Sequence, residues 1–304
     1  MTETSLEIQA TKEKSAAAFT SVIAAIGLTA MKIVVGVLTG SLGILAEAAH
    51  SGLDLVAALV TFFAVRLSGK PADAQHNFGH GKIENLSALF ETLLLLVTCI
   101  WIIYEAIQRL FIHPVDVDAS IWAFLVMAVS IAVDATRSKM LFAAARKHNS
   151  QALEADALHF STDIWSSSVV IGGLVLVKIA EWTGLTWLHK ADSVAALGVA
   201  LIVMYVSVQM GIKTIKGLLD TAPDGLAGKV ELAAKAVPGV ADCHAVRIRA
   251  AGPDIFVDVH ILVDPALPLF DVHAITDQVE AAVRQVAGEG ADVTVHAEPL
   301  VPPQ

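Results

Sequence analysis

The sequence is poor in charged residues. Only 16% of its 304 residues are charged, whereas 55% are hydrophobic and the mean hydropathy is +0.66. Soluble domains usually contain ~25% charged residues. This composition excludes an ordinary soluble enzyme and indicates an integral membrane protein.

Cysteine is also scarce, since Cys99 and Cys243 are the only two and no CxxC pair occurs. A disulfide framework is therefore not expected. The first residues, MTETSLEIQATKEKS, mix charges and lack a short apolar core followed by a small-residue cleavage site. We expect no secretory signal peptide there.

Long apolar stretches dominate the first two thirds of the chain. About 20 apolar residues suffice to cross a ~30 Å hydrocarbon core, and the candidate stretches lie at 15–37, 44–66, 86–108, 119–141, 155–178 and 191–212. We therefore predict a bundle of six transmembrane helices. The predicted organisation is a cytoplasmic tail (1–14), a transmembrane domain (15–216) and a cytoplasmic domain (217–304).

Basic residues flank these stretches unevenly and predict their orientation. One side receives eleven of them: Lys12, Lys14, Arg66, Lys70, Lys82, Arg137, Lys139, Arg146, Lys147, Lys213 and Lys216. The other side receives three: Arg109, Lys178 and Lys190. The imbalance predicts that both termini lie in the cytoplasm, as an even number of spans requires.

The region from Gly217 onward is acidic and reads as a small α+β domain. Its thirteen acidic and five basic residues disfavour binding to nucleic acid or to an anionic membrane surface and suit cations. Helical patterns at 226–237 and 269–287 and alternating strand patterns at 241–252, 254–264 and 292–299 predict an αββαβ order. Such a domain has one open sheet face, which a homodimer would cover.

An eight-residue pattern occurs twice within the apolar stretches, as EAAHSGLD (47–54) and DALHFSTD (156–163). Residues four apart share a helix face, so two helices would present four ligands, and an aspartate in mid-membrane costs ~2.5–3.5 kcal/mol. These four are His50, Asp54, His159 and Asp163. Four N/O ligands suit tetrahedral Zn²⁺, and the imidazoles disfavour Mg²⁺ and Ca²⁺.

A simpler interpretation is that each histidine only hydrogen-bonds the aspartate of its own helix. The acids that open the two copies, Glu47 and Asp156, share the same helical faces. They could contact the ligands or conduct protons.

Two further groups of potential ligands lie outside the apolar stretches. In the loop PADAQHNFGHGK (71–82), Asp73, His76 and His80 are spaced three and four apart, and two glycines would let the loop fold round an ion. The acidic region contributes His244, His260, His273, His296 and Glu298. His296 and Glu298 share a strand face. In both groups the side chains could instead be solvated without a ligand.

Together these features resemble the cation diffusion facilitator family, and most closely its bacterial zinc and ferrous-iron efflux type. The likeness covers nearly the whole chain: six spans, the paired HxxxD motifs, the PADxxHxFGHGKxE loop and an αββαβ domain that ends in VHxEP. It implies a ferredoxin-like or metallochaperone-like cytoplasmic domain. It also implies a homodimer in the bacterial inner membrane that exchanges cytoplasmic Zn²⁺ for external protons, with Fe²⁺, Cd²⁺, Co²⁺ or Mn²⁺ as alternative substrates.

The resemblance also implies roles for individual residues. The four HxxxD residues fall on the family's transport site, the loop trio on its loop site, and the four histidines with Glu298 on its cytoplasmic metal cluster. Lys82 and Asp220 match an interlock that holds two protomers together near the membrane surface.

Two other functions are compatible with metal-binding motifs in a membrane protein. A metal sensor would bind without transport. An intramembrane metalloenzyme needs an open coordination position and a general base, commonly arranged as HExxH, and the chain contains no HExxH. We therefore expect a transporter and not an enzyme.

Overall fold

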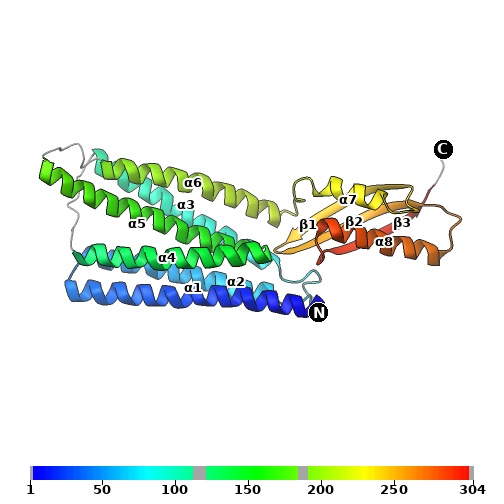
Figure 1. The fold of residues 1–304 in the computed structure, drawn as a ribbon, viewed down its shortest axis with the longest axis horizontal. Coiled ribbons are helices and arrows are strands. Elements are labelled where there is room, and N and C mark those ends of the chain that lie inside the picture. The colour runs from blue at the N-terminus through cyan, green and yellow to red at the C-terminus, as the bar shows by residue number, and fades with distance from the viewer. Residues whose placement is uncertain (1–2, 112–120, 184–190, 301–304) are drawn as a thin grey trace.

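The computed structural model describes residues 3–111, 121–183 and 191–300. The chain forms an elongated molecule with a bundle of long helices at one end and a small domain of strands and helices at the other (Figure 1). The division follows the change from apolar to acidic sequence.

The bundle contains the helices α1 (Glu3–Thr39), α2 (Leu42–Ser68), α3 (Lys82–Phe111), α4 (Ile121–His148), α5 (Gln151–Thr183) and α6 (Ala191–Leu218). Among the described residues, those of α1, α2, α3, α4 and α6 form helices long and apolar enough to cross a bilayer. The predicted stretch 155–178 lies within α5, which is 33 residues long.

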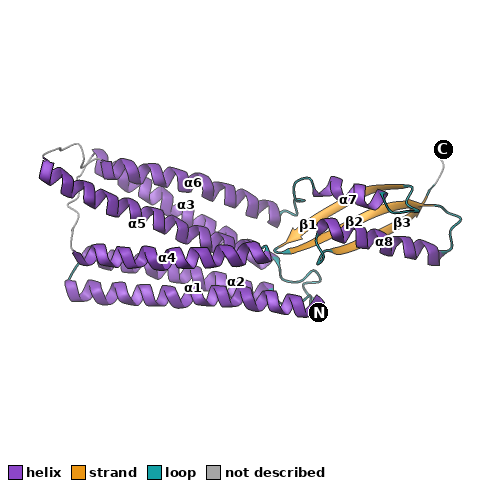
Figure 2. Cartoon of the chain, viewed as in Figure 1, coloured by secondary structure: helices purple, strands orange, loops and turns teal. Residues whose placement is uncertain are grey.

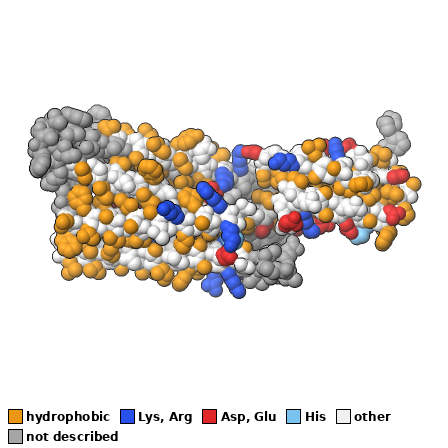
Figure 3. Space-filling model, in the orientation of Figure 1, with side chains coloured by type: hydrophobic (Ala, Val, Ile, Leu, Met, Phe, Trp, Pro, Cys, Tyr) orange, Lys and Arg blue, Asp and Glu red, His pale blue; other side chains and the backbone are white. Residues whose placement is uncertain are grey.

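The outer surface of the bundle is apolar. Large hydrophobic side chains there are open to the surroundings, including Leu38 (81% exposed), Trp101 (67%) and Val97 (65%). Hydrophobic atoms cover much of the bundle in Figure 3, whereas acidic and basic side chains gather on the smaller domain and near the junction. Soluble proteins rarely expose so large an apolar surface to water, so the bundle suits the interior of a bilayer.

The first helix begins earlier than its apolar stretch. It includes most of the predicted tail, because polar residues of that segment bind other helices. The Lys14 ammonium lies 2.6 Å from the Glu84 carboxylate of α3. Glu13 pairs with Lys147 and His148 of α4. Residues of the predicted tail are therefore part of the bundle.

Two basic residues counted toward the cytoplasmic side lie inside the bundle. Lys14 is 4% exposed and Arg137 is 3% exposed. The Arg137 guanidinium stacks 3.4 Å from the ring centroid of Phe160 and donates to Asp134 at 3.0 Å. The predicted orientation then depends on the nine remaining basic residues of that side. Of the opposing three, Lys190 lies outside the described residues.

The small domain at the other end of the molecule has the predicted αββαβ order. Its elements are α7 (Leu226–Lys235), β1 (Asp242–Ala251), β2 (Asp254–Val263), α8 (Leu269–Ala287) and β3 (Asp292–Pro299). The sheet order is β1-β2-β3, with β1 antiparallel and β3 parallel to β2 (Figure 2). Parallel neighbours require a crossover connection, and α8 supplies it.

Both helices of this domain cover one face of the sheet. Val230 of α7 and Val279 of α8 pack on Val257, Val259 and Ile261 of the central strand, and all five are at most 1% exposed. Because side chains alternate along a strand, the residues between these positions lie on the opposite face. The second face of the sheet therefore carries the polar residues of β2.

The turn between β1 and β2 meets the helical bundle. The Gly252 N–H donates to the Asn85 side chain of α3 at 2.8 Å. Nearby, the Phe78 ring of the 71–82 loop packs edge-on against Phe256, and the Arg249 guanidinium lies 3.6 Å above the Phe78 ring. The loop is thus bound to the small domain.

Replacing Gly81 with alanine is expected to loosen this junction. An added Cβ would lie 2.1 Å from the Ala251 carbonyl oxygen, so one backbone must move away from the other. Such overpacking typically costs ~1–3 kcal/mol. The measurement is the thermal midpoint of the purified protein, together with protease cleavage between the bundle and the small domain.

Gly228→Ala is the matched control, because nothing lies within 4 Å of a Cβ added in α7. It should leave the midpoint unchanged or raise it, since alanine favours a helix by ~0.5–1 kcal/mol over glycine. Parental stability and protease resistance in Gly81→Ala would show that the close backbone approach is dispensable.

Candidate metal sites

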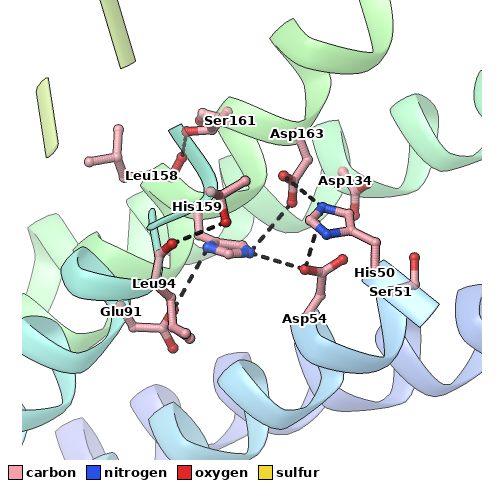
Figure 4. A network of polar contacts seen from close by, with 12 residues as sticks. His50, Ser51, Asp54, Glu91, Leu94, Asp134, Leu158, His159, Ser161 and Asp163 are labelled. Atoms are coloured by element: carbon pink, nitrogen blue, oxygen red, sulfur yellow. Dashed lines mark hydrogen bonds and ion pairs between the residues drawn. The ribbon is translucent and has the colours of Figure 1, made fainter. Parts of the chain in front are cut away.

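The HxxxD motif of α2 faces the HxxxD motif of α5. His159 Nε2 lies 3.2 Å from Asp54 Oδ1 and 3.7 Å from Asp163 Oδ2. His50 Nε2 lies 3.8 Å from Asp163 Oδ1 and 3.9 Å from Asp54 Oδ1. Figure 4 shows the four side chains converging between the two helices. The structure therefore brings together all four residues predicted from the repeat.

The contacts between helices are at least as close as those within each helix. His159 is nearer to Asp54 of α2 than to Asp163 of its own helix, and His50 is as near to Asp163 as to Asp54. This pattern disfavours the interpretation in which each histidine serves only the aspartate four residues on. Donor atoms around a tetrahedral Zn²⁺ with bonds of ~2.0–2.1 Å are about 3.3 Å apart. Ligand atoms of His50, Asp54 and Asp163 all lie within 4.8 Å of one another and so are close enough to share an ion, and His159 adjoins this trio through Asp54 and Asp163.

The four residues differ in their access to solvent or bilayer. Asp54 and His159 are buried, at 8% and 4% exposure. The His50 side chain is 37% exposed and that of Asp163 is 16% exposed. His50 is therefore the most exposed of the four ligands.

Among the described residues, the acids that open the two motifs form no ion pair with the four ligands. Glu47 Oε2 is 3.2 Å from Lys32 Nζ of α1, and Lys32 also donates to Ser51 at 2.7 Å. Glu47 is thus paired with a cation. Asp156 is fully buried. A proton-conducting role for either acid stays a prediction.

The 71–82 loop gathers its three predicted ligands. His76 Nδ1 lies 3.2 Å from Asp73 Oδ1, and His80 Nε2 lies 3.4 Å from Asp73 Oδ2. The backbone N–H groups of His76 and Gln75 donate to Asp73 and lower the pKa of its carboxyl. Gly79 adopts a φ of +73°, a left-handed conformation that suits glycine. The turn itself thus orients a charged carboxylate toward both imidazoles.

The register of the sheet aligns three histidines on its open face. His244 pairs with His260 across β1 and β2, and His260 pairs with His296 across β2 and β3. Glu298 lies among them: its carboxylate oxygens are 2.9 Å from His260 Nδ1, 3.5 Å from His244 Nε2 and 3.6 Å from His296 Nε2. Four of the five predicted cytoplasmic ligands are therefore close together.

His273 does not join this group within one chain. It lies on α8, the helix that covers the opposite face of the sheet, and its ring is 3.8 Å from Asp277 Oδ1. The sequence shows that these five residues are suitable ligands, but the sheet register and the helix layer determine which of them are neighbours. A metal-binding role for His273 stays a prediction.

Lys82 and Asp220 form an ion pair at the junction. Lys82 Nζ lies 2.9 Å from Asp220 Oδ1 and also donates to the Leu218 carbonyl at 3.4 Å. The pair joins the start of α3 to the end of α6. Within one chain it holds these helix ends together, and its effect on a second protomer stays a prediction.

Glu91 contacts the four-ligand group. From its place in an apolar stretch, the sequence indicates only that it could line a water-filled path or pair with a neighbour. Glu91 of α3 is fully buried, and its Oε2 lies 4.0 Å from His159 Nδ1. A carboxylate inside an apolar stretch is a signal of function. Which neighbour the carboxylate faces is decided only by how α3 packs against α5.

Comparison with known proteins gives matches along nearly the whole chain. Residues 18–219 match the model of the cation efflux transmembrane domain, and residues 222–300 match the cytoplasmic domain of cation efflux proteins. The cation-efflux pump FieF of Yersinia enterocolitica serotype O:8 is 34% identical over 290 residues, which cover 94% of this chain and 92% of the pump. FieF of Pectobacterium atrosepticum is 33% identical over 291 residues, covering 91% and 92%.

Among solved structures, MamM-CTD 215-293 is 32% identical to the aligned part of this chain. The alignment covers 25% of this chain and 98% of that one, with a TM-score of 0.24.

Proposed function

This chain belongs to the cation efflux family, and we propose that it exports Zn²⁺ from the cytoplasm in exchange for protons. Its relatives are named as efflux pumps, so the chain is a transporter of divalent cations and not an enzyme. Zinc as the preferred ion and protons as the counter-ion are our proposal. Fe²⁺, Cd²⁺, Co²⁺ and Mn²⁺ are the competing substrates.

The convergence of His50, Asp54, His159 and Asp163 between α2 and α5 carries this proposal. Two imidazoles and two carboxylates form a ligand set that suits Zn²⁺ better than Mg²⁺ or Ca²⁺. Each helix supplies one histidine and one aspartate, so a relative movement of α2 and α5 would change the separations between the two pairs. Such movement is what alternating access requires.

Proton exchange follows from the chemistry of the same four side chains. Metal binds to deprotonated carboxylates and neutral imidazoles, so protons compete with the ion for these atoms. Histidine titrates in the physiological range. Metal release on the far side would let the ligands take up protons, which are returned to the cytoplasm when the next ion binds.

We place the protein in the bacterial inner membrane as a homodimer, with both termini in the cytoplasm. The matched dimerisation-type cytoplasmic region and the open, histidine-lined sheet face support this arrangement. The loop trio and the His244, His260, His296 and Glu298 cluster would bind further ions from the cytoplasm.

The test of transport uses the purified protein in lipid vesicles that contain dyes for zinc and for pH. External zinc should raise the internal zinc signal and move protons in the opposite direction. A sensor would leave both signals unchanged and so contradict the proposal. Competition among Zn²⁺, Fe²⁺, Cd²⁺, Co²⁺ and Mn²⁺ at several pH values reports the preferred ion and the proton coupling together.

Zinc binding to the cytoplasmic region is expected to draw two protomers together. The region carries a net charge of −8 from Gly217 onward, and bound cations would reduce the repulsion between two copies. The measurement is the distance between spin labels on the cytoplasmic regions of the full-length protein, with and without zinc. We expect a shorter distance with zinc, and no such change in the His260→Ala variant. An unchanged distance in the parent would contradict this regulation.

A further inference from the structure

His159 has polar groups on both sides of its ring. Nε2 faces the ligand group, 3.2 Å from Asp54 Oδ1 and 3.7 Å from Asp163 Oδ2. Nδ1 faces away from it, 4.0 Å from Oε2 of Glu91 (Figure 4). The residue thus lies between its metal-site partners and a third carboxylate that comes from α3.

The two atoms that face each other here have no other hydrogen-bond partner among the described residues. His159 Nδ1 and Glu91 Oε2 are both buried and unpaired. The other oxygen of Glu91 accepts a hydrogen bond from the Thr61 hydroxyl at 3.0 Å, which holds the carboxylate in place. Buried polar atoms without a partner are costly. A shift of either side chain by about 1 Å would bring His159 Nδ1 and Glu91 Oε2 to hydrogen-bond distance.

This contact affects metal binding because the two nitrogens of a neutral imidazole ring are not equivalent. A neutral histidine carries its proton on one ring nitrogen and offers a lone pair on the other. For Nε2 to bind a metal, the proton must be on Nδ1. A carboxylate beside Nδ1 favours that tautomer and orients the ring, and loss of such a partner typically weakens metal binding ~10–100-fold.

The other histidine of the site lacks an equivalent carboxylate contact in the described structure. Both ion pairs of His50 use Nε2, and its side chain is 37% exposed. Its ring is therefore only partly enclosed by the protein. His159 is 4% exposed, so its second nitrogen depends on the protein.

We propose that Glu91 is a positioning residue that accepts the Nδ1–H of His159 and thereby directs the Nε2 lone pair toward the transported metal. This inference rests on the proposed function, because it takes His159 to be a metal ligand. The supporting observation is that α3 places a buried, unpaired carboxylate oxygen opposite an unpaired ring nitrogen.

The first test observes the Nδ1–H of His159 with zinc bound, because in the metal-free protein Nε2 lies at hydrogen-bond distance from the Asp54 carboxylate, 3.2 Å away. The protein is labelled with ¹⁵N in the histidine rings, and the His159 signals are identified by their loss in His159→Asn. In the zinc-loaded parent, the Nδ1 proton should show the downfield shift and slow exchange of a hydrogen bond to a carboxylate. Glu91→Gln should keep a hydrogen-bonded Nδ1–H, because the amide oxygen can accept the same proton, whereas Glu91→Leu should lose the hydrogen bond.

The second test measures zinc affinity by competition with a chelator, with Asp163→Ala defining the signal of the intramembrane site. Glu91→Leu should weaken binding ~10–100-fold, and Glu91→Gln should lie within a few-fold of the parent. Glu154→Gln is the matched control, since it neutralises a carboxylate of the same helix that pairs with Lys213 of α6. It should leave both the Nδ1–H signal and the zinc affinity unchanged.

An unchanged Nδ1–H signal in zinc-loaded Glu91→Leu, or equal loss of affinity in the Gln and Leu variants, would overturn the inference. Absence of zinc binding by the parent would contradict the proposed function instead. Zinc binding by the parent, measured first, separates these two failures.

Discussion

Replacing Asp163 with alanine is expected to reduce zinc flux into vesicles by more than ~100-fold. Asp163 is within 3.8 Å of both histidines of the site, so its loss removes one ligand and a charge that balances the cation. Loss of a group that only supports a ligand costs ~10–100-fold, and loss of the ligand should cost more. The measurement is the initial rate of the vesicle zinc signal at equal protein content.

The chain offers a matched control for this experiment. His273 and Asp277 on α8 repeat the HxxxD spacing, with 3.8 Å between ring nitrogen and carboxylate. Asp277 is exposed, and in the described part of the chain no second HxxxD helix faces it, so Asp277→Ala should leave the basal flux unchanged. Parental flux in Asp163→Ala would remove the proposed transport site.

Replacing Glu84 with alanine is expected to destabilise the protein by ~3–5 kcal/mol, because it leaves the buried Lys14 ammonium without its partner. Glu84 also accepts hydrogen bonds from Ser68 of α2 and from Ser150 at the start of α5. One carboxylate therefore joins four helices. The measurement is the thermal midpoint in detergent or nanodiscs, which should fall by roughly 5–15 °C.

Two variants distinguish a buried charge from a general effect of mutation. Lys14→Met combined with Glu84→Leu removes both charges and should restore most of the stability, since a buried pair is often replaceable by apolar side chains. Glu231→Ala breaks the exposed Glu231–Lys235 pair of α7 and should change the midpoint little. A single Glu84→Ala variant as stable as the parent would show that Lys14 finds another partner or solvent.

Much of the fold could be predicted because local sequence determines it. Apolar stretches of ~20 residues allow few structures other than membrane helices, and the alternating patterns at 241–252 and 254–264 form the strands β1 and β2. The predicted limits of α8, 269–287, match those of the structure. The start of α1 was not predictable in this way, because Glu13 and Lys14 become part of the bundle through partners more than sixty residues away.

The sequence by itself determined the class of protein, the order of its elements and the chemical identity of its ligands. It could not determine which ligands meet. Within the helices, the HxxxD spacing occurs at His50, His159 and His273, and in each case it places two side chains on one helix face. Only the packing of α2 against α5 joins two of these pairs, while the third lies alone on α8.

The same distinction applies to the remaining polar residues. Glu47 shares a helix face with His50 yet pairs with Lys32 of α1, and Glu91, which belongs to no motif, faces His159. Helical periodicity relates residues three and four apart within one helix. The partner across the interface depends on the rotation and depth of a neighbouring helix, and these are set by the packing of the whole bundle.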